Sequence, residues 1–114
     1  YLDAGIITAI GSDAPITVPN PMNSLFGALN RMDQKTGDTV GQMQKVDVLQ
    51  AVRIFTYNGA YASFEENVKG SLEPGKLADV VILDQDLLTW PAEQVRDVQV
   101  RYTLIGGEVV YARD

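Results

Sequence analysis

Histidine and cysteine are both absent from this sequence of 114 residues, and each absence removes a class of site. Without cysteine there are no disulfides and no thiolate metal ligands, and the redox compartment cannot be inferred. Without histidine, the metal ligands that remain are carboxylates and carbonyls, which suit Mg²⁺ or Ca²⁺ better than Zn²⁺. A zinc site would therefore need ligands from outside this chain.

Basic residues and long apolar runs are also scarce. The sequence contains nine Lys and Arg and 15 Asp and Glu, so its formal net charge is −6. This charge argues against nucleic-acid or anionic-membrane partners. No apolar stretch approaches the ~20 residues needed to span a bilayer. The sequence begins at Tyr1, so we expect its natural start to be missing, and cytoplasm is only the default compartment. The hydrophobic content of 46% suffices for a core, in one small domain or a piece of a larger one.

The first half of the chain predicts a buried strand followed by two helices. Residues 5–10, GIITAI, are apolar and rich in β-branched side chains, as in a parallel strand covered on both faces. Asn20 and Pro21 predict the start of a helix, and after a polar loop over residues 33–45 a second helix is predicted to open at Asp47. There, Asp47 and Gln50 have the spacing of a capping box. Asn58-Gly59 is predicted to break or cap this second helix.

The second half predicts β-structure. Pro74-Gly75 suits a type II turn, and a strand is expected over residues 78–83. Residues 98–104 alternate apolar and polar side chains, the pattern of a strand with one buried face. Gly106-Gly107 predicts a two-residue hairpin turn that pairs Leu104 with Val109 and Tyr102 with Tyr111.

Asp13 is the residue most open to a chemical role. It stands in GSDAP, directly after the predicted strand. Ser-Asp before a proline is also ordinary turn chemistry, in which the carboxylate accepts a hydrogen bond from a nearby backbone N–H. Its position at the end of a buried strand favours a site, because α/β folds place their sites in loops at the carboxyl ends of parallel strands.

Three blocks of sequence resemble one enzyme superfamily. They are AIGSDAPI at residues 9–16, VLQAVRIFTYNGAYAS at 48–63 and GSLEPGKLADVVILDQDLL at 70–88, closed by VRYTLIGGEVVY at 100–111. Together they resemble the C-terminal part of a metal-dependent amidohydrolase, in the branch that includes N-substituted formamide deformylase. The third block is the most specific of the three.

The resemblance implies a fold and a role for Asp13. Residues 1–66 would form the end of a (β/α)8 barrel, with its last strand and helices, and residues 67–114 the C-terminal strands of a small β-sandwich. Asp13 would be the essential aspartate after the last strand, a metal ligand that also exchanges a proton with the metal-bound water. The metal would be divalent, with zinc implied by the family, and the substrate a small amide-like molecule.

The other ligands of the family have no counterpart here, so the remainder of the same polypeptide is the expected partner. They are a His-x-His pair, a mid-barrel carboxylate or carbamylated lysine, and two later histidines. We therefore expect the isolated chain to bind no metal and to be inactive, and to pair or swap with another copy.

Other polar residues favour structural roles. Arg31 ends the first helix at a position where the family often has arginine, which leaves a role in substrate binding open, but an exposed or ion-paired side chain is the simpler interpretation. Asp79 and Asp84 flank a strand, which they would cap or protect. A competing hypothesis makes the whole chain a free-standing α+β binding or assembly module, in which Asp13 only closes a turn.

Overall fold

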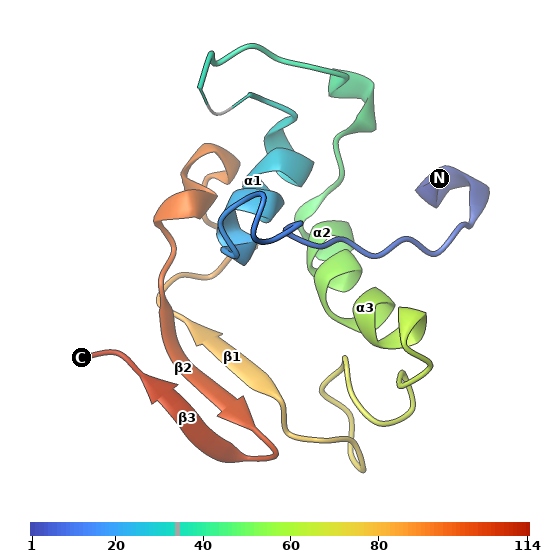
Figure 1. Ribbon diagram of the computed structural model, residues 1–114, viewed down its shortest axis with the longest axis vertical. Helices are drawn as coiled ribbons and strands as arrows, with labels where there is room; N and C mark the ends of the chain where they lie inside the picture. The colour runs from blue at the N-terminus through green and yellow to red at the C-terminus, as the bar shows by residue number, and fades with distance from the viewer. Residues whose placement is uncertain (34) are drawn as a thin grey trace.

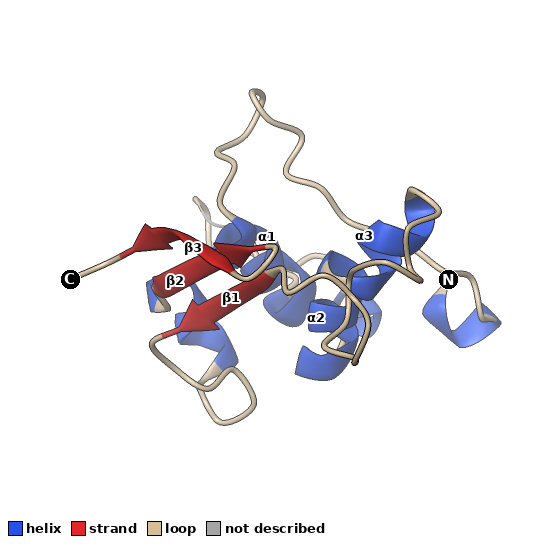
Figure 2. Ribbon diagram, turned by 90° about the horizontal axis from the view of Figure 1, so that it is seen from below, coloured by secondary structure: helices blue, strands red, loops and turns tan. Residues whose placement is uncertain are grey.

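The computed structural model describes residues 1–33 and 35–114. These residues form three α-helices, Pro21–Asn30 (α1), Val48–Phe55 (α2) and Tyr57–Ala62 (α3). They also form one antiparallel sheet of three strands, Val80–Leu83 (β1), Val100–Ile105 (β2) and Glu108–Ala112 (β3). Short 3-10 segments lie at Leu2–Ala4, Gln42–Gln44 and Ala92–Asp97. Helices and sheet lie side by side, with the two termini on opposite sides (Figures 1 and 2).

Helix α1 begins where the sequence predicts. The Asn20 side chain accepts a hydrogen bond from the Met22 N–H at 3.0 Å, and Pro21 occupies the first helical position, where its missing N–H costs nothing. The apolar side chains at helical spacing are buried: Met22, Leu25, Phe26 and Leu29. The helix ends at Arg31, whose backbone is left-handed, with φ of 50°.

Helices α2 and α3 are separated at Thr56 and not at Asn58-Gly59. The capping box that opens α2 is confirmed: the Gln50 N–H donates to the Asp47 carboxylate at 2.8 Å, and the Gln50 side chain accepts from the Asp47 N–H at 3.1 Å. The predicted break at Asn58-Gly59 is wrong, because both residues lie inside α3. Asn58 is held there by a long-range hydrogen bond from its side chain to the Thr8 carbonyl.

Residues 5–10 do not form the predicted strand: Gly5 has a left-handed backbone, and residues 6–10 run as an open segment without regular secondary structure (Figure 1). Ile6, Ile7 and Ile10 are 49%, 47% and 39% exposed, so the predicted burial on both faces is also absent. The physical reason is that a strand is defined by a backbone ladder to its neighbours. Among the described residues, no strand lies along this segment.

The sheet has the order β1-β2-β3 and ends in the predicted hairpin. Leu104 pairs with Val109, as predicted, across the two-residue turn at Gly106-Gly107. Tyr111 pairs with Thr103 and not with Tyr102, because a register shift between Thr103 and Leu104 displaces the rest of β3 by one residue. Such a β-bulge moves every later side chain to the opposite face, which an alternating pattern alone does not reveal.

The loop before β1 contains the predicted turn. The Lys76 N–H donates to the Glu73 carbonyl at 3.2 Å, with Pro74 and Gly75 between them. Gly75 has φ of +94°, as the third position of a type II turn requires. The strand itself begins at Val80, two residues after the predicted start.

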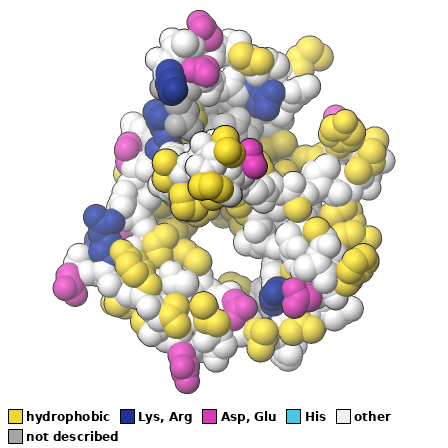
Figure 3. Space-filling view, in the orientation of Figure 1, with side chains coloured by type: hydrophobic (Ala, Val, Ile, Leu, Met, Phe, Trp, Pro, Cys, Tyr) yellow, Lys and Arg dark blue, Asp and Glu magenta, His cyan; other side chains and the backbone are white. Residues whose placement is uncertain are grey.

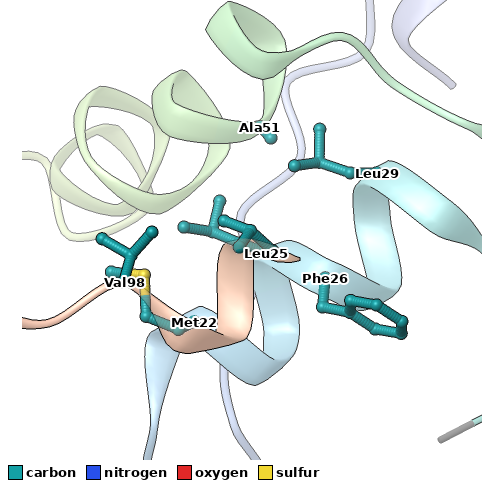
Figure 4. Close-up of a cluster of buried hydrophobic side chains, with 7 residues drawn as sticks. Met22, Leu25, Phe26, Leu29, Ala51 and Val98 are labelled. Atoms are coloured by element: carbon teal, nitrogen blue, oxygen red, sulfur yellow. The ribbon is translucent and has the colours of Figure 1, made fainter. Parts of the chain in front are cut away.

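The hydrophobic core joins residues that are far apart in sequence (Figure 4). The apolar face of α1 packs against Ala51 of α2 and against Val95 and Val98. Val95 lies in the 3-10 segment Ala92–Asp97, and Val98 directly follows it. The buried Asn30 side chain strengthens this contact by donating to the Ala92 carbonyl at 2.8 Å. The segment that leads into β2 is therefore fixed to the helices.

The chain exposes more surface than an ordinary domain of its mass. Its accessible surface is 8030 Å² at 12.4 kDa, whereas a free-standing domain of that mass exposes about 6,100 Å². Every residue of β3 is exposed, and on β2 the side chain of Tyr102 is 43% exposed, so the expected buried face is incomplete. In the described part of the chain, no helix is long and apolar enough to cross a bilayer.

Candidate active site

Asp13 occupies a tight turn at the end of the open N-terminal segment. Its carbonyl accepts hydrogen bonds from the N–H groups of Ile16 at 2.9 Å and Thr17 at 3.4 Å. Ser12 stabilises the same turn, since its hydroxyl accepts from the Ala14 N–H at 3.3 Å and its carbonyl accepts from the Thr17 hydroxyl. The turn is therefore built from backbone groups and from Ser12 and Thr17, and it does not use the Asp13 carboxylate.

The backbone of Asp13 is left-handed, with φ of 56°. Few residues other than glycine adopt this conformation, although aspartate is among those that tolerate it best. Strained residues of this kind concentrate at functional sites, where the surrounding structure holds them in place. Here the two hydrogen bonds to the Asp13 carbonyl hold the turn, and the residue projects a side chain where a glycine would project none.

The Asp13 carboxylate is exposed to solvent and has no hydrogen-bond or ion-pair partner among the described residues. A carboxylate that only closed a turn would accept from a backbone N–H, as Asp33 does from Lys35 and Thr36 at 2.8 Å each. Asp13 differs from Asp33 in this respect. Its two oxygens are available to an external ligand.

Asp13 can supply one ligand to a metal ion, but this chain does not supply a complete metal site. Protein sites for divalent cations generally combine several side-chain ligands. In the part of the chain that the structure describes, no three Asp or Glu residues come close enough to hold a metal ion together. Asp13 could therefore take part in a metal site only if other ligands came from outside the described residues.

A cavity of about 500 Å³ lies beside the segment that leads into Asp13. Its wall includes Ile10 from that segment, Ala28 and Arg31 from the end of α1, and Ile54 from α2. The loop after α1 closes it with Val40 and Gln44. Asp13 itself does not line this cavity, which is mainly apolar and has Arg31 as its basic residue.

Arg31 is held by the loop that it faces. Its Nε donates to the Val40 carbonyl at 3.2 Å and its Nη2 to the Gln44 side chain at 2.8 Å. Its carbonyl accepts from the Val40 N–H at 2.8 Å. The expectation of an exposed or ion-paired arginine is therefore not met, because the side chain is half-buried and its acceptors are neutral.

A second, wider groove separates the helices from the sheet and appears as the central hollow in Figure 3. Its volume is about 850 Å³, with walls from α1, α2, α3 and β1 and from the loop that contains Gly70 and Leu72. The Tyr57 ring lies in this wall, with the Arg53 guanidinium 4.4 Å from its centroid and the Lys76 ammonium 5.7 Å away. The groove is mostly apolar, and the acidic residue in its lining, Asp79, has a carboxylate that accepts a hydrogen bond from the Gly106 N–H, unlike the unpartnered carboxylate of Asp13.

The acidic residues around the sheet have structural roles, as expected. The Asp79 carboxylate accepts from the Gly106 N–H at 2.8 Å and closes the hairpin turn. The Asp84 carboxylate accepts from the Gln99 N–H at 2.8 Å and joins β1 to the start of β2. The Lys76 ammonium, at 2.6 Å, and the Ser71 hydroxyl hold the pKa of Glu73 below its ordinary value.

Two buried asparagines that organise this region were not identified from the sequence. Asn30 connects α1 to Ala92, and Asn58 connects α3 to Thr8. Each is 5% exposed. The available signal was an amide side chain within the apolar face of a predicted helix, since a buried polar group requires a hydrogen-bond partner. The identity of that partner depends on the tertiary fold.

The chain belongs to the Amidohydrolase family, whose sequence profile matches residues 1–111. It corresponds to a C-terminal segment of an amidohydrolase-superfamily protein, as the resemblance of its three blocks implied. The match includes the Asp13 turn, the three helices and the sheet up to Tyr111.

Named relatives are similar over nearly the whole chain. It is 31% identical over 112 residues to an N-substituted formamide deformylase from Arthrobacter pascens, covering 98% of this chain and 20% of that protein. It is 34% identical over 112 residues to Protein LONG AFTER FAR-RED 3 from Arabidopsis thaliana, covering 96% of this chain and 19% of that protein. It is 34% identical over 115 residues to a probable imidazolonepropionase from Danio rerio, covering 99% of this chain and 24% of that protein.

A solved structure has the same fold. An amidohydrolase from Thermotoga maritima superposes with a TM-score of 0.72 at 23% identity, covering 98% of this chain and 24% of that chain. The present chain thus spans about a fifth to a quarter of the length of the relatives that it matches.

Proposed function

We propose that this chain is part of a metal-dependent amidohydrolase that hydrolyses C–N bonds of small amide-like substrates, and that Asp13 is its catalytic carboxylate. The observation that carries the proposal is the exposed, unpartnered carboxylate of Asp13, projected from a left-handed turn within a segment that matches the Amidohydrolase family. An aspartate used only for the turn would have directed its oxygens to the backbone.

Asp13 would act through proton transfer. A divalent cation, zinc by family resemblance, would supply water activation and polarisation of the substrate carbonyl when bound. The Asp13 carboxylate would contribute one ligand oxygen, take a proton from the attacking water and return it to the leaving nitrogen, which departs as a neutral amine. Its exposure leaves both oxygens free for these roles.

The rest of the site would come from the same polypeptide. We propose that residues 1–66 complete a (β/α)8 barrel and that residues 67–114 complete a small β-sandwich. Support comes from the accessible surface, which exceeds that of a free-standing domain by about 1,900 Å². The exposed isoleucines of residues 5–10 and the exposed strand β3 contribute to this excess. These features favour a barrel segment over a free-standing module, so the isolated chain would be catalytically silent.

The full-length protein tests the reaction class. We would measure amine release from formamides and other acylated amines before and after removal of bound metal with a chelator, and again after Zn²⁺ is added back. The proposal predicts release that is lost with the metal and restored with it. Absence of release from every amide, or release that a chelator leaves unchanged, would contradict it. The isolated 114-residue chain serves as the inactive control.

A further inference from the structure

We propose that the cavity beside Ile10 is a subsite for an acidic substituent of the substrate, and that Arg31 binds its carboxylate. This proposal rests on the proposed function for the reaction itself, but the binding step can be measured separately. It assigns to Arg31 a specificity role and to the substrate a negatively charged, partly apolar character.

The cavity lies within reach of the proposed reacting centre. Ile10 lines it, and Asp13 follows only three residues later. Three residues of fully extended chain span at most about 11 Å, so the Asp13 Cα lies within that distance of the Ile10 Cα. A small molecule with its amide at Asp13 could therefore extend a substituent into the cavity. The volume of about 500 Å³ accommodates such a group.

Arg31 has a backbone conformation that is unusual for arginine. It ends α1 in a left-handed conformation, a position at which helices usually have glycine or asparagine. Arginine is strained there, because its Cβ crowds the following carbonyl oxygen. Glycine would end the helix without that strain, but it could not make the two hydrogen bonds that hold the Arg31 guanidinium against the loop at the cavity.

The guanidinium of Arg31 is fixed in position and lacks a compensating charge. Its two hydrogen bonds go to neutral oxygens, the Val40 carbonyl and the Gln44 amide. Neither ion pair among the described residues involves Arg31, and its Nη1 donates to none of them. An orientated guanidinium with a free edge is well suited to a carboxylate, which forms strong charge-assisted hydrogen bonds with arginine.

The neighbouring groups define the ligand further. Asp33 also lines the cavity, but one of its carboxylate oxygens accepts from both the Lys35 and Thr36 N–H groups, so it is engaged in its own turn. Most of the remaining wall is hydrocarbon, from Ile10, Ala28 and Ile54 among others. The combination fits a short aliphatic chain that ends in a carboxylate.

The first test measures binding to the full-length protein by calorimetry, with hexanoate and the neutral alcohol 1-hexanol as probes of the same carbon number; neither has a C–N bond to hydrolyse. Hexanoate should bind the wild type, and Arg31→Met should weaken it by about 10- to 100-fold, the range expected for a lost charged hydrogen bond. 1-Hexanol should distinguish the two proteins by less than about twofold. Arg31→Lys keeps the positive charge without the planar guanidinium, so its affinity for hexanoate should lie between those of the wild type and Arg31→Met.

Two further variants make the result decisive. Arg101→Met removes the same charge from an exposed position in β2 and should leave hexanoate binding unchanged. Arg31→Gly suits the left-handed backbone, so it provides a folded variant without the guanidinium if the methionine variant does not fold. Absence of hexanoate binding to the wild type, or equal hexanoate binding to the wild type, Arg31→Met and Arg31→Gly, would overturn the proposal. Equal binding would also mean that another group, such as the metal, holds the carboxylate.

A kinetic comparison separates this proposal from the proposed function. With an amide that carries a carboxylate and with its methyl ester, Arg31→Met should raise KM for the acid alone and leave kcat for both unchanged. Equal loss on the acid and the ester would indicate a structural role and contradict the proposal. Hexanoate binding that depends on Arg31 in a protein that hydrolyses no amide would overturn the proposed function and leave the subsite supported.

Discussion

The side chain of Asn58 donates a hydrogen bond of 2.8 Å to the carbonyl of Thr8, fifty residues earlier in the chain. Thr8 lies in the open segment that ends at the Asp13 turn, and Asn58 lies in α3, so this bond fixes the segment to the helices. Asn58 is 5% exposed, and its amide is therefore withdrawn from water. Asn58 therefore helps to position the Asp13 turn, although Asn58 is not itself part of the candidate active site.

Replacing Asn58 by alanine should destabilise the full-length protein. The variant loses a buried hydrogen bond and leaves the Thr8 carbonyl without that donor, at a cost of about 1–3 kcal/mol. Thermal unfolding should therefore show a lower midpoint. Asn67→Ala, at an exposed position, is the matched control and should leave the midpoint unchanged. An unchanged midpoint for Asn58→Ala would show that the contact does not stabilise the fold.

Alanine substitutions at two glycines should have opposite effects on stability. A Cβ at Gly70 would lie 2.7 Å from the Ala60 Cβ, and the residue has φ of +92°, so Gly70→Ala should cost about 1–3 kcal/mol. A Cβ at Gly59, inside α3, would meet no atom within 4 Å, so Gly59→Ala should stabilise the helix by about 0.5–1 kcal/mol. Denaturant unfolding of both variants measures the difference. Effects of the same sign would refute the packing described around Gly70.

Acid should weaken the turn that precedes β1. The Lys76 ammonium and the Ser71 hydroxyl lower the pKa of Glu73 from its ordinary value of 4.5, because both favour the charged carboxylate. A lowered pKa in the folded protein contributes stability above the unfolded value, and this contribution is lost as pH falls through the folded value. Stability should thus decline below about pH 4.5. Glu73→Gln should reduce that dependence, and an unchanged pH profile for the variant would argue against the interaction.

The isolated 114-residue chain should self-associate. Its exposed apolar residues include Val81 and Ile82 of β1, Ile105 of β2, and Val109 and Val110 of β3. Exposed strands of this kind pair with other chains. Sedimentation velocity should show association that increases with concentration, and Val109→Lys should reduce it. A stable monomer of ordinary compactness would instead support the free-standing module.

Local signals in the sequence correctly predicted where α1 and α2 begin and where the turn before β1 lies, but not where α2 ends. Asn20-Pro21, the Asp47-Gln50 box and Pro74-Gly75 each act through groups a few residues apart, so sequence spacing is sufficient to predict them. The pairing of Tyr111 with Thr103 depends on a bulge, and the placement of Asn58 depends on Thr8. Both follow from contacts that form only in the folded chain.

The candidate site was predictable only in part. Asp13 stood out because it follows an apolar segment, and the structure adds that its carboxylate has no partner among the described residues. The strand predicted over residues 5–10 did not form, since a ladder needs neighbours and the described residues provide none there. The cavity at Arg31 joins α1, α2 and the intervening loop, and no spacing in the sequence indicated that they meet.

The most direct measurement of the central claim is turnover by the full-length Asp13→Asn variant. Asparagine keeps the size of the side chain but cannot carry a proton from water to the leaving nitrogen. We predict that amide hydrolysis falls by about 100-fold or more, with the unfolding midpoint unchanged because the Asp13 turn is built from its backbone. Hydrolysis at the wild-type rate by the folded, metal-loaded variant would contradict the account.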